Sequence, residues 1–220
     1  MLITLLLVAH IAVLGYWLGS ELVINSTYRY VCYGRHIPFA ERSRLMEHVM
    51  HVDQHVRYAL VLQAGLGFGL ATVYGLLPGG TTLALVIAAL TVAWLGFVEA
   101  VHRLRHHRVG KTLGAVDRGS RYLFMALLLA LACGVIGGNW ELPLWLRLKI
   151  GLFAAVMASG VGIRLALIQH FRTWAQMTLD GPSDAGNTSI ERTYVRATAV
   201  LVLLWLFIAA IVAVSVIKPA

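Results

Sequence analysis

The hydrophobic pattern of the chain consists of long apolar stretches separated by short polar segments. Six stretches are long enough, or nearly so, to cross about 30 Å of hydrocarbon as α-helices. They cover residues 1–24, 53–77, 82–103, 121–138, 144–168 and 195–217. The pattern therefore predicts an all-α protein, a polytopic membrane helix bundle of about six transmembrane helices that forms a single domain over residues 1–220.

The composition and the placement of charge refine this picture. With 59% hydrophobic and only 13% charged residues, a soluble globular domain is excluded. Fifteen of the 18 Lys and Arg residues fall on one face when the crossings are counted. The positive-inside rule makes that face cytoplasmic and puts both termini outside. We therefore expect a multi-pass protein of a bacterial inner membrane, surrounded by lipid bilayer. Topology explains the net charge of +8, so nucleic acid is not an expected partner.

The polar segments give more local expectations. Residues 40–55 have a helical pattern, so the second span is expected to begin outside the bilayer. Segment 104–120 is expected to be a basic inner loop, and segment 178–189, with the sequence LDGPSDAGNTSI, a flexible inner loop.

Histidines gather on the predicted cytoplasmic face, which carries eight of the nine. Two neighbouring helices carry matched i, i+3, i+7 triads: His48, His51 and His55, and then Glu99, His102 and His106. Each triad occupies a narrow helical face. Imidazoles and carboxylates at one depth are typical of a metal centre. The predicted metal ligands are Glu21, Glu47, His48, His51, His55, Glu99, His102 and His106.

We expect most of these ligands to converge on one site just inside the cytoplasmic boundary, because helices joined by a short outer turn pack side by side. The alternative is that juxtamembrane His and Glu side chains only solvate helix ends, which is the preferred interpretation for His36, His107 and His170. His10 differs because it lies inside the first span, where a histidine is a functional candidate.

Three metal chemistries fit this residue set. Haem b needs axial histidines and cationic partners for its propionates, for which Arg57 and Arg164 are candidates. A carboxylate-bridged di-iron site often uses the pattern Glu99-x-x-His102. A histidine-rich di-iron site is suggested by His51-x-x-x-His55 and His102-x-x-x-His106-His107, which resemble the first two histidine boxes of membrane desaturases and hydroxylases.

Two helices also resemble a known group. His10-Ile11 followed by Trp17-Leu18-Gly19 resembles the opening helix of the CopD and HemJ-like membrane proteins. The run WLRLKIGL over residues 145–152 is similar to the Trp-Leu-x-x-Lys-x-x-Leu helix of the same group. The resemblance covers about a fifth of the chain. It implies a bundle that binds haem b through His10, with Lys149 near the same functional half.

The leading functional expectation is an inner-membrane redox metalloprotein that binds haem b and exchanges electrons with a quinone or a partner subunit. The first alternative is a non-haem di-iron or copper oxygenase or hydroxylase that uses the cytoplasmic His/Glu cluster on a lipid-soluble substrate. The second alternative is a metal transporter or a structural subunit of a membrane complex.

Overall fold

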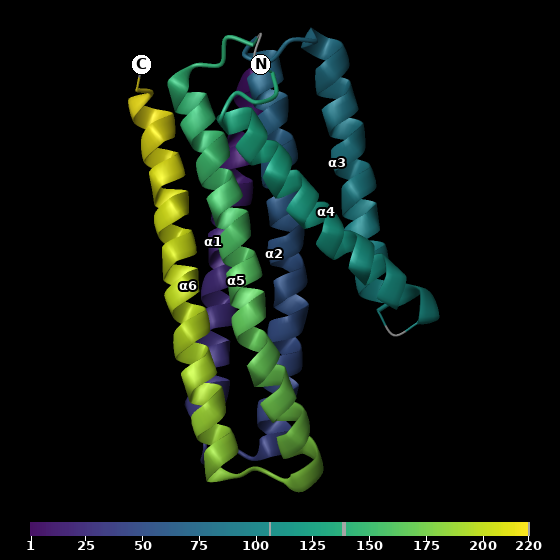
Figure 1. Cartoon of the computed structure of the whole chain (residues 1–220), viewed down its shortest axis with the longest axis vertical. Helices are drawn as coiled ribbons and strands as arrows, with labels where there is room; N and C mark the ends of the chain where they lie inside the picture. Colours follow the sequence, from purple (N-terminus) through teal and green to yellow (C-terminus); the bar gives the residue numbers. More distant parts are fainter. Residues whose placement is uncertain (106, 138–139, 220) are drawn as a thin grey trace. The chain divides into compact units, whose positions relative to one another are not determined.

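The computed structural model describes residues 1–105, 107–137 and 140–219. The described residues form six α-helices (Figure 1). The helices are α1 (Leu2–Tyr33), α2 (Phe39–Val73), α3 (Gly80–Arg103), α4 (Arg108–Ala132), α5 (Leu144–Asp180) and α6 (Asp184–Ile217). The expectation of an all-α protein is thereby confirmed.

Within the described residues, five of these helices are long and apolar enough to cross a membrane: α1, α2, α3, α5 and α6. Large apolar side chains on them remain exposed, for example Leu5, Leu90 and Leu206, each about three-fifths accessible. Hydrocarbon can cover such side chains while each helix satisfies its own backbone polar groups. The chain is therefore consistent with a multi-pass membrane protein in contact with lipid.

The last two helices are longer than the apolar pattern predicts. α5 continues past residue 168 to Asp180, and α6 begins at Asp184, so the predicted loop over 178–189 is wrong except at residues 181–183. The break is short because Ser183 caps α6, its Oγ accepting a hydrogen bond from the Gly186 backbone N–H at 3.1 Å. Gly181, whose φ of +87° is a conformation that favours glycine, ends α5.

The other two connections predicted on the inner side are also shorter than expected. α1 runs to Tyr33 and α2 starts at Phe39, which confirms the predicted helix over 40–55 and leaves only residues 34–38 as a link. The predicted basic loop over 104–120 is wrong over most of its length, because α4 begins at Arg108.

The fourth predicted span, 121–138, is also displaced. α4 ends at Ala132, and Gly134 has a φ of +75°, which turns the chain. Arg147 Nε donates to the Ala132 carbonyl at 2.9 Å and satisfies one of the free carbonyls at the end of the helix. The charged residues of α4 all lie between Arg108 and Arg121, and α4 is not among the five helices apolar enough to span.

The chain divides into two compact units. Unit 1 consists of Met1–Ile24, Met50–Tyr122 and Gly138–Leu142. Unit 2 consists of Asn25–Val49, Leu123–Gly137 and Pro143–Ala220. In unit 2, α5 packs along α6, and buried Val156, Ile190 and Leu204 belong to its core.

Candidate functional site

The α2 and α3 segments of unit 1 lie in close contact. Gln54 Nε2 donates to the Val98 carbonyl at 3.3 Å. Farther along, Gly65 faces Thr91 so closely that an added Cβ would lie 2.9 Å from the Thr91 Cβ. A glycine at this position therefore lets the two helices approach.

This contact brings one pair of the predicted metal ligands together. The ring centroids of His51 and His102 lie 6.2 Å apart, with the ring planes inclined by 70°. His51 is exposed and His102 is half-buried, so the pair is accessible. The two residues come from the two triads that the sequence singled out.

Glu99 lies one turn before His102 on α3 and is held by two side chains. Its carboxylate accepts hydrogen bonds from the Tyr58 hydroxyl and from Arg103 Nε. The Arg103 contact is also an ion pair on the same helix. Glu99 is therefore an oriented anion in the same stretch of the α2 and α3 surface as the histidine pair.

His55 is engaged by α1. Its Nδ1 shares a hydrogen bond with the Tyr16 hydroxyl, and the two rings meet edge to face with centroids 5.9 Å apart. His55 also lies 6.2 Å, ring to ring, from Tyr58. Two tyrosines thus accompany the histidines of α2.

His10 faces α2 rather than lipid. Its Nε2 lies 3.2 Å from Gln63 Nε2, within hydrogen-bond distance. A Cβ placed on Gly67 would lie 3.4 Å from His10 Cε1, so the ring packs against a helix surface that has no side chain there.

Arg57, predicted as a propionate partner, forms an internal ion pair. Its Nη2 donates to Asp117 Oδ2 on α4 at 2.7 Å, and Arg121 Nη2 donates to the same oxygen at 2.7 Å. The Asp117 side chain is only 5% exposed. One buried carboxylate therefore accepts hydrogen bonds from two guanidinium groups, and its bond to Arg57 links α4 to α2.

Glu21 is buried, at 7% exposure, and accepts a 3.3 Å hydrogen bond from Trp17 on its own helix. The remaining candidates are more peripheral: Glu47, His48 and Arg164 are exposed, and Lys149 is half-buried in α5. His106 lies outside the described residues. Among the residues that the structure describes, no group of three His, Cys, Asp or Glu side chains is arranged to hold one metal ion. The larger site therefore stays a prediction.

Unit 2 contains a buried polar network that the sequence did not single out. Arg42 is 1% exposed, and it donates to the Val31 carbonyl and to Asn187 Oδ1, each at 2.9 Å. Its guanidinium lies 5.5 Å from the Trp174 ring centroid. The partners are neutral oxygens and an aromatic face, which together solvate the cation in place of water.

His170 belongs to the same network and is fully buried. Its Nδ1 shares a 2.9 Å hydrogen bond with the Tyr28 hydroxyl, and its ring stacks on Trp174 with centroids 5.3 Å apart. The prediction treated His170 as a solvated helix end. Its burial corrects this, because α5 continues past residue 168 and carries His170 into the packed part of unit 2.

Arg35, in the link between α1 and α2, contacts α6 beside this network. It makes two hydrogen bonds to the Glu191 carboxylate, at 2.7 and 2.9 Å. These bonds raise the pKa of the Arg35 guanidinium. The contact joins the 34–38 link to the start of α6.

Sequence reasoning missed several of these partners. Tyr58 follows His51 and His55 at i+7 and i+3, so it continues the same stripe and could have been found from the spacing. Asp117 is an acidic residue within a basic segment, which also indicates a paired role. Arg42 gave no signal, because it was one of many basic residues near a predicted span.

Comparison of the chain with protein-family models, with curated proteins and with solved structures found no significant match.

Proposed function

We propose that this chain is a membrane redox metalloprotein whose metal ion is held by His51 and His102. The observation that carries the proposal is the 6.2 Å separation of these two rings on neighbouring helices. A metal about 2.0–2.1 Å from one nitrogen of each ring puts the ring centroids roughly 5–6.5 Å apart. Imidazole suits iron, copper, zinc and nickel, and the first two support redox chemistry.

Glu99 supports the same proposal through its charge. Its carboxylate is oriented by Tyr58 and Arg103, one turn from His102. Fixed carboxylates near ligating histidines compensate the charge of a metal and orient its ligands. Two histidines leave further coordination positions to water, to a substrate or to another side chain of the two triads.

The proposal covers two forms, a non-haem iron or copper ion and haem b. They differ in the role of His10, which would be a ligand only in the haem form. One feature of His10 favours haem: its ring faces α2 at Gly67, where α2 has no side chain. Its Nε2, however, is within hydrogen-bond distance of Gln63, so ligation of haem iron there requires Gln63 to move. The His51–His102 pair needs no such displacement, and the geometry therefore favours the non-haem form.

The exposed apolar helix surfaces suit a reaction partner that is dissolved in the bilayer or embedded in it. For haem b this partner is a quinone or a redox subunit. For a non-haem ion it is a lipid-soluble substrate of an oxygenase or hydroxylase. A metal transporter would use the same two histidines, His51 and His102, to bind the ion transiently.

We further propose that the histidine pair lies on the cytoplasmic side of a bacterial inner membrane, with both termini outside. The Arg35–Glu191 contact supports this arrangement. It requires the 34–38 link and the start of α6 to lie on the same side of the membrane. Since α2, α3 and α5 each cross once, the segment that contains α4 must return the chain between α3 and α5. The number of crossings is then even, as the proposed arrangement with both termini on one side requires.

The test is an absorption spectrum of the purified full chain together with elemental analysis by mass spectrometry. The proposal predicts bound iron or copper. A Soret band that disappears in His10→Ala assigns haem b, whereas bound metal without a Soret band assigns a non-haem ion. A folded, metal-free preparation from cells supplied with iron and copper contradicts the proposal. Metal flux into vesicles without redox activity assigns the transporter.

A further inference from the structure

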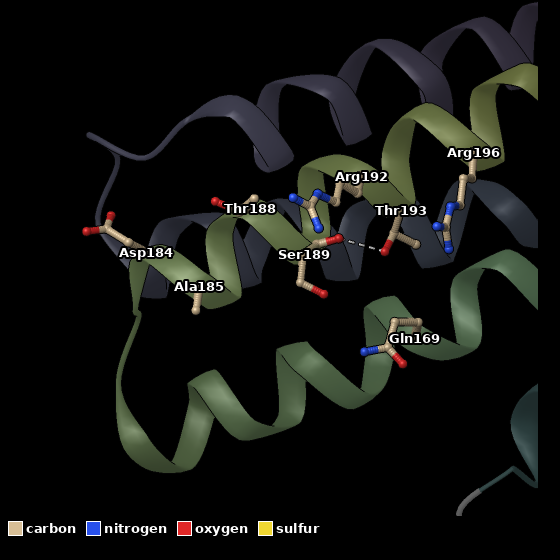
Figure 2. Close-up of a pocket in the computed structure, with 8 residues that line it drawn as sticks. All are labelled: Gln169, Asp184, Ala185, Thr188, Ser189, Arg192, Thr193 and Arg196. Carbon is tan, nitrogen blue, oxygen red and sulfur yellow. Dashed lines mark hydrogen bonds between the residues drawn. The ribbon is translucent and has the colours of Figure 1, made fainter.

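A polar hollow of about 540 Å³ lies between α5 and α6 in unit 2 (Figure 2). Figure 2 shows Gln169 of α5 across the hollow from the α6 residues, and the Arg196 side chain extending toward α5. The volume is in the range of small-molecule sites. The lining is polar, and the residues that matter here are Gln169, Thr188, Ser189, Arg192, Thr193 and Arg196.

Two arginines give the hollow an uncompensated positive charge. Arg192 and Arg196 are exposed and stand one turn apart on α6, where like charges repel. Among the described residues, no carboxylate lies within ion-pair distance of either. Asp184 also lines the hollow, but its side chain is 98% exposed and its ion pair, at 3.7 Å, is with Arg35, which also binds Glu191. The two arginines together still outweigh this one carboxylate in the lining. An anion placed in the hollow would relieve the repulsion between the two guanidinium groups.

Neutral hydrogen-bonding groups complete the lining, and they are held in place. The Thr193 hydroxyl donates to the Ser189 carbonyl at 2.8 Å. Ser189 Oγ lies 3.2 Å from Thr173 Oγ1, which accepts a 3.4 Å bond from Gln169 Nε2. The Thr173–Ser189 contact therefore links α5 to α6, and the other two bonds fix side chains within each helix. Arginine forks combined with hydroxyl donors are typical of phosphate recognition.

The position of the hollow indicates where a phosphate would come from. Arg196 directly precedes the apolar run of α6, so the two arginines lie where that helix leaves the hydrocarbon. Basic pockets between transmembrane helices on the cytoplasmic side bind anionic headgroups. We propose that this hollow binds a phosphate group, presented by an anionic phospholipid headgroup or by free phosphate. The site belongs to unit 2 and is independent of the proposed metal pair in unit 1.

The experiment measures binding to the full chain in a non-ionic detergent by calorimetry. The probes are short-chain phosphatidylglycerol, short-chain phosphatidylcholine and inorganic phosphate. Saturable binding of one phosphatidylglycerol per chain, with phosphatidylcholine much weaker, assigns a lipid headgroup. Saturable binding of inorganic phosphate alone assigns free phosphate. If neither anion binds, the proposal is overturned.

Variants decide whether binding occurs in the hollow. Arg192→Gln and Arg196→Gln should each weaken binding about tenfold or more, because each removes a charge-assisted contact. Arg172→Gln, which removes an exposed charge from α5 outside the hollow, is the matched control and should change binding less than about twofold. Equal losses in all three variants would show general charge attraction and overturn the proposal.

A steric variant gives an independent check. Ala185 lines the hollow and is exposed, so Ala185→Trp should fill part of the space while both arginines stay in place. Binding should be lost without loss of helical content in the circular dichroism spectrum. Unchanged binding in Ala185→Trp would place the anion elsewhere and contradict the assignment.

Discussion

The imidazole rings of His51 on α2 and His102 on α3 lie 6.2 Å apart, and they belong to two i, i+3, i+7 triads. The pairing depends on how closely the two helices approach. That approach is set farther along the same helices by Gly65 against Thr91 and by the Gln54 hydrogen bond to the Val98 carbonyl. The proposed metal pair is thus a consequence of helix packing, and packing variants should affect it.

Gly65→Ala should separate α2 from α3, because the added Cβ would lie 2.9 Å from Thr91 Cβ. Overpacking of this kind costs about 1–3 kcal/mol. We expect a lower thermal unfolding midpoint in detergent and less bound metal. Gly69→Ala is the matched control: it meets open space and should be neutral or slightly stabilising. Equal stability of the two variants would contradict the close α2–α3 contact.

Asp117→Asn should destabilise the chain, because it removes the carboxylate charge that both Arg57 and Arg121 bind. Loss of a largely buried carboxylate that serves two arginines is expected to cost about 2–3 kcal/mol. Thermal unfolding measures the loss. Glu41→Gln removes the exposed ion pair with Arg44 and should cost less than about 1 kcal/mol. A small effect of Asp117→Asn would show that the pair contributes little.

Tyr28→Phe should destabilise unit 2 by about 1–2 kcal/mol, because it removes the hydrogen-bond partner of the fully buried His170. Tyr194→Phe is the control, since Tyr194 contacts Tyr28 and Tyr33 through its ring. Thermal unfolding followed by near-ultraviolet circular dichroism distinguishes them. If both variants are equally stable, the Tyr28 hydroxyl is not what holds His170.

Topology can be tested by cysteine labelling in a Cys133→Ser background expressed in bacteria. A membrane-impermeant maleimide should label Tyr74→Cys in intact cells, because residue 74 follows α2 on the predicted outer side. His36→Cys and Pro182→Cys should need broken cells, and they should behave alike because Arg35 contacts Glu191. Different labelling of positions 36 and 182 would contradict the even number of crossings.

The existence of the helices was predictable from the sequence, and their ends were not. Long apolar runs specify helices in lipid without reference to the rest of the chain. The extensions of α5 and α6 are polar, and they depend on the Ser183 cap and on partners such as Arg35 and Glu191, which come from distant segments. A hydropathy pattern carries no information on which polar side chains pair with one another.

The candidate site was likewise predictable only in part. Helical spacing put His51 and His102 into matched stripes, because the period of a helix fixes which residues share a face, and the structure has their rings 6.2 Å apart. It could not show that Glu99 would be engaged by Tyr58 and Arg103, or that Arg57 would pair with Asp117. Those partners depend on the register between helices, which a single sequence does not specify.

The most direct test of the central claim is the metal content of His51→Ala and His102→Ala relative to His36→Ala, measured by mass spectrometry on chains purified in parallel. His36 is exposed in the 34–38 link and is the matched control. The account predicts that each of the first two variants loses most of its iron or copper, while His36→Ala retains the wild-type amount and all three keep the wild-type helical content. Wild-type metal content in His51→Ala and His102→Ala would contradict the account.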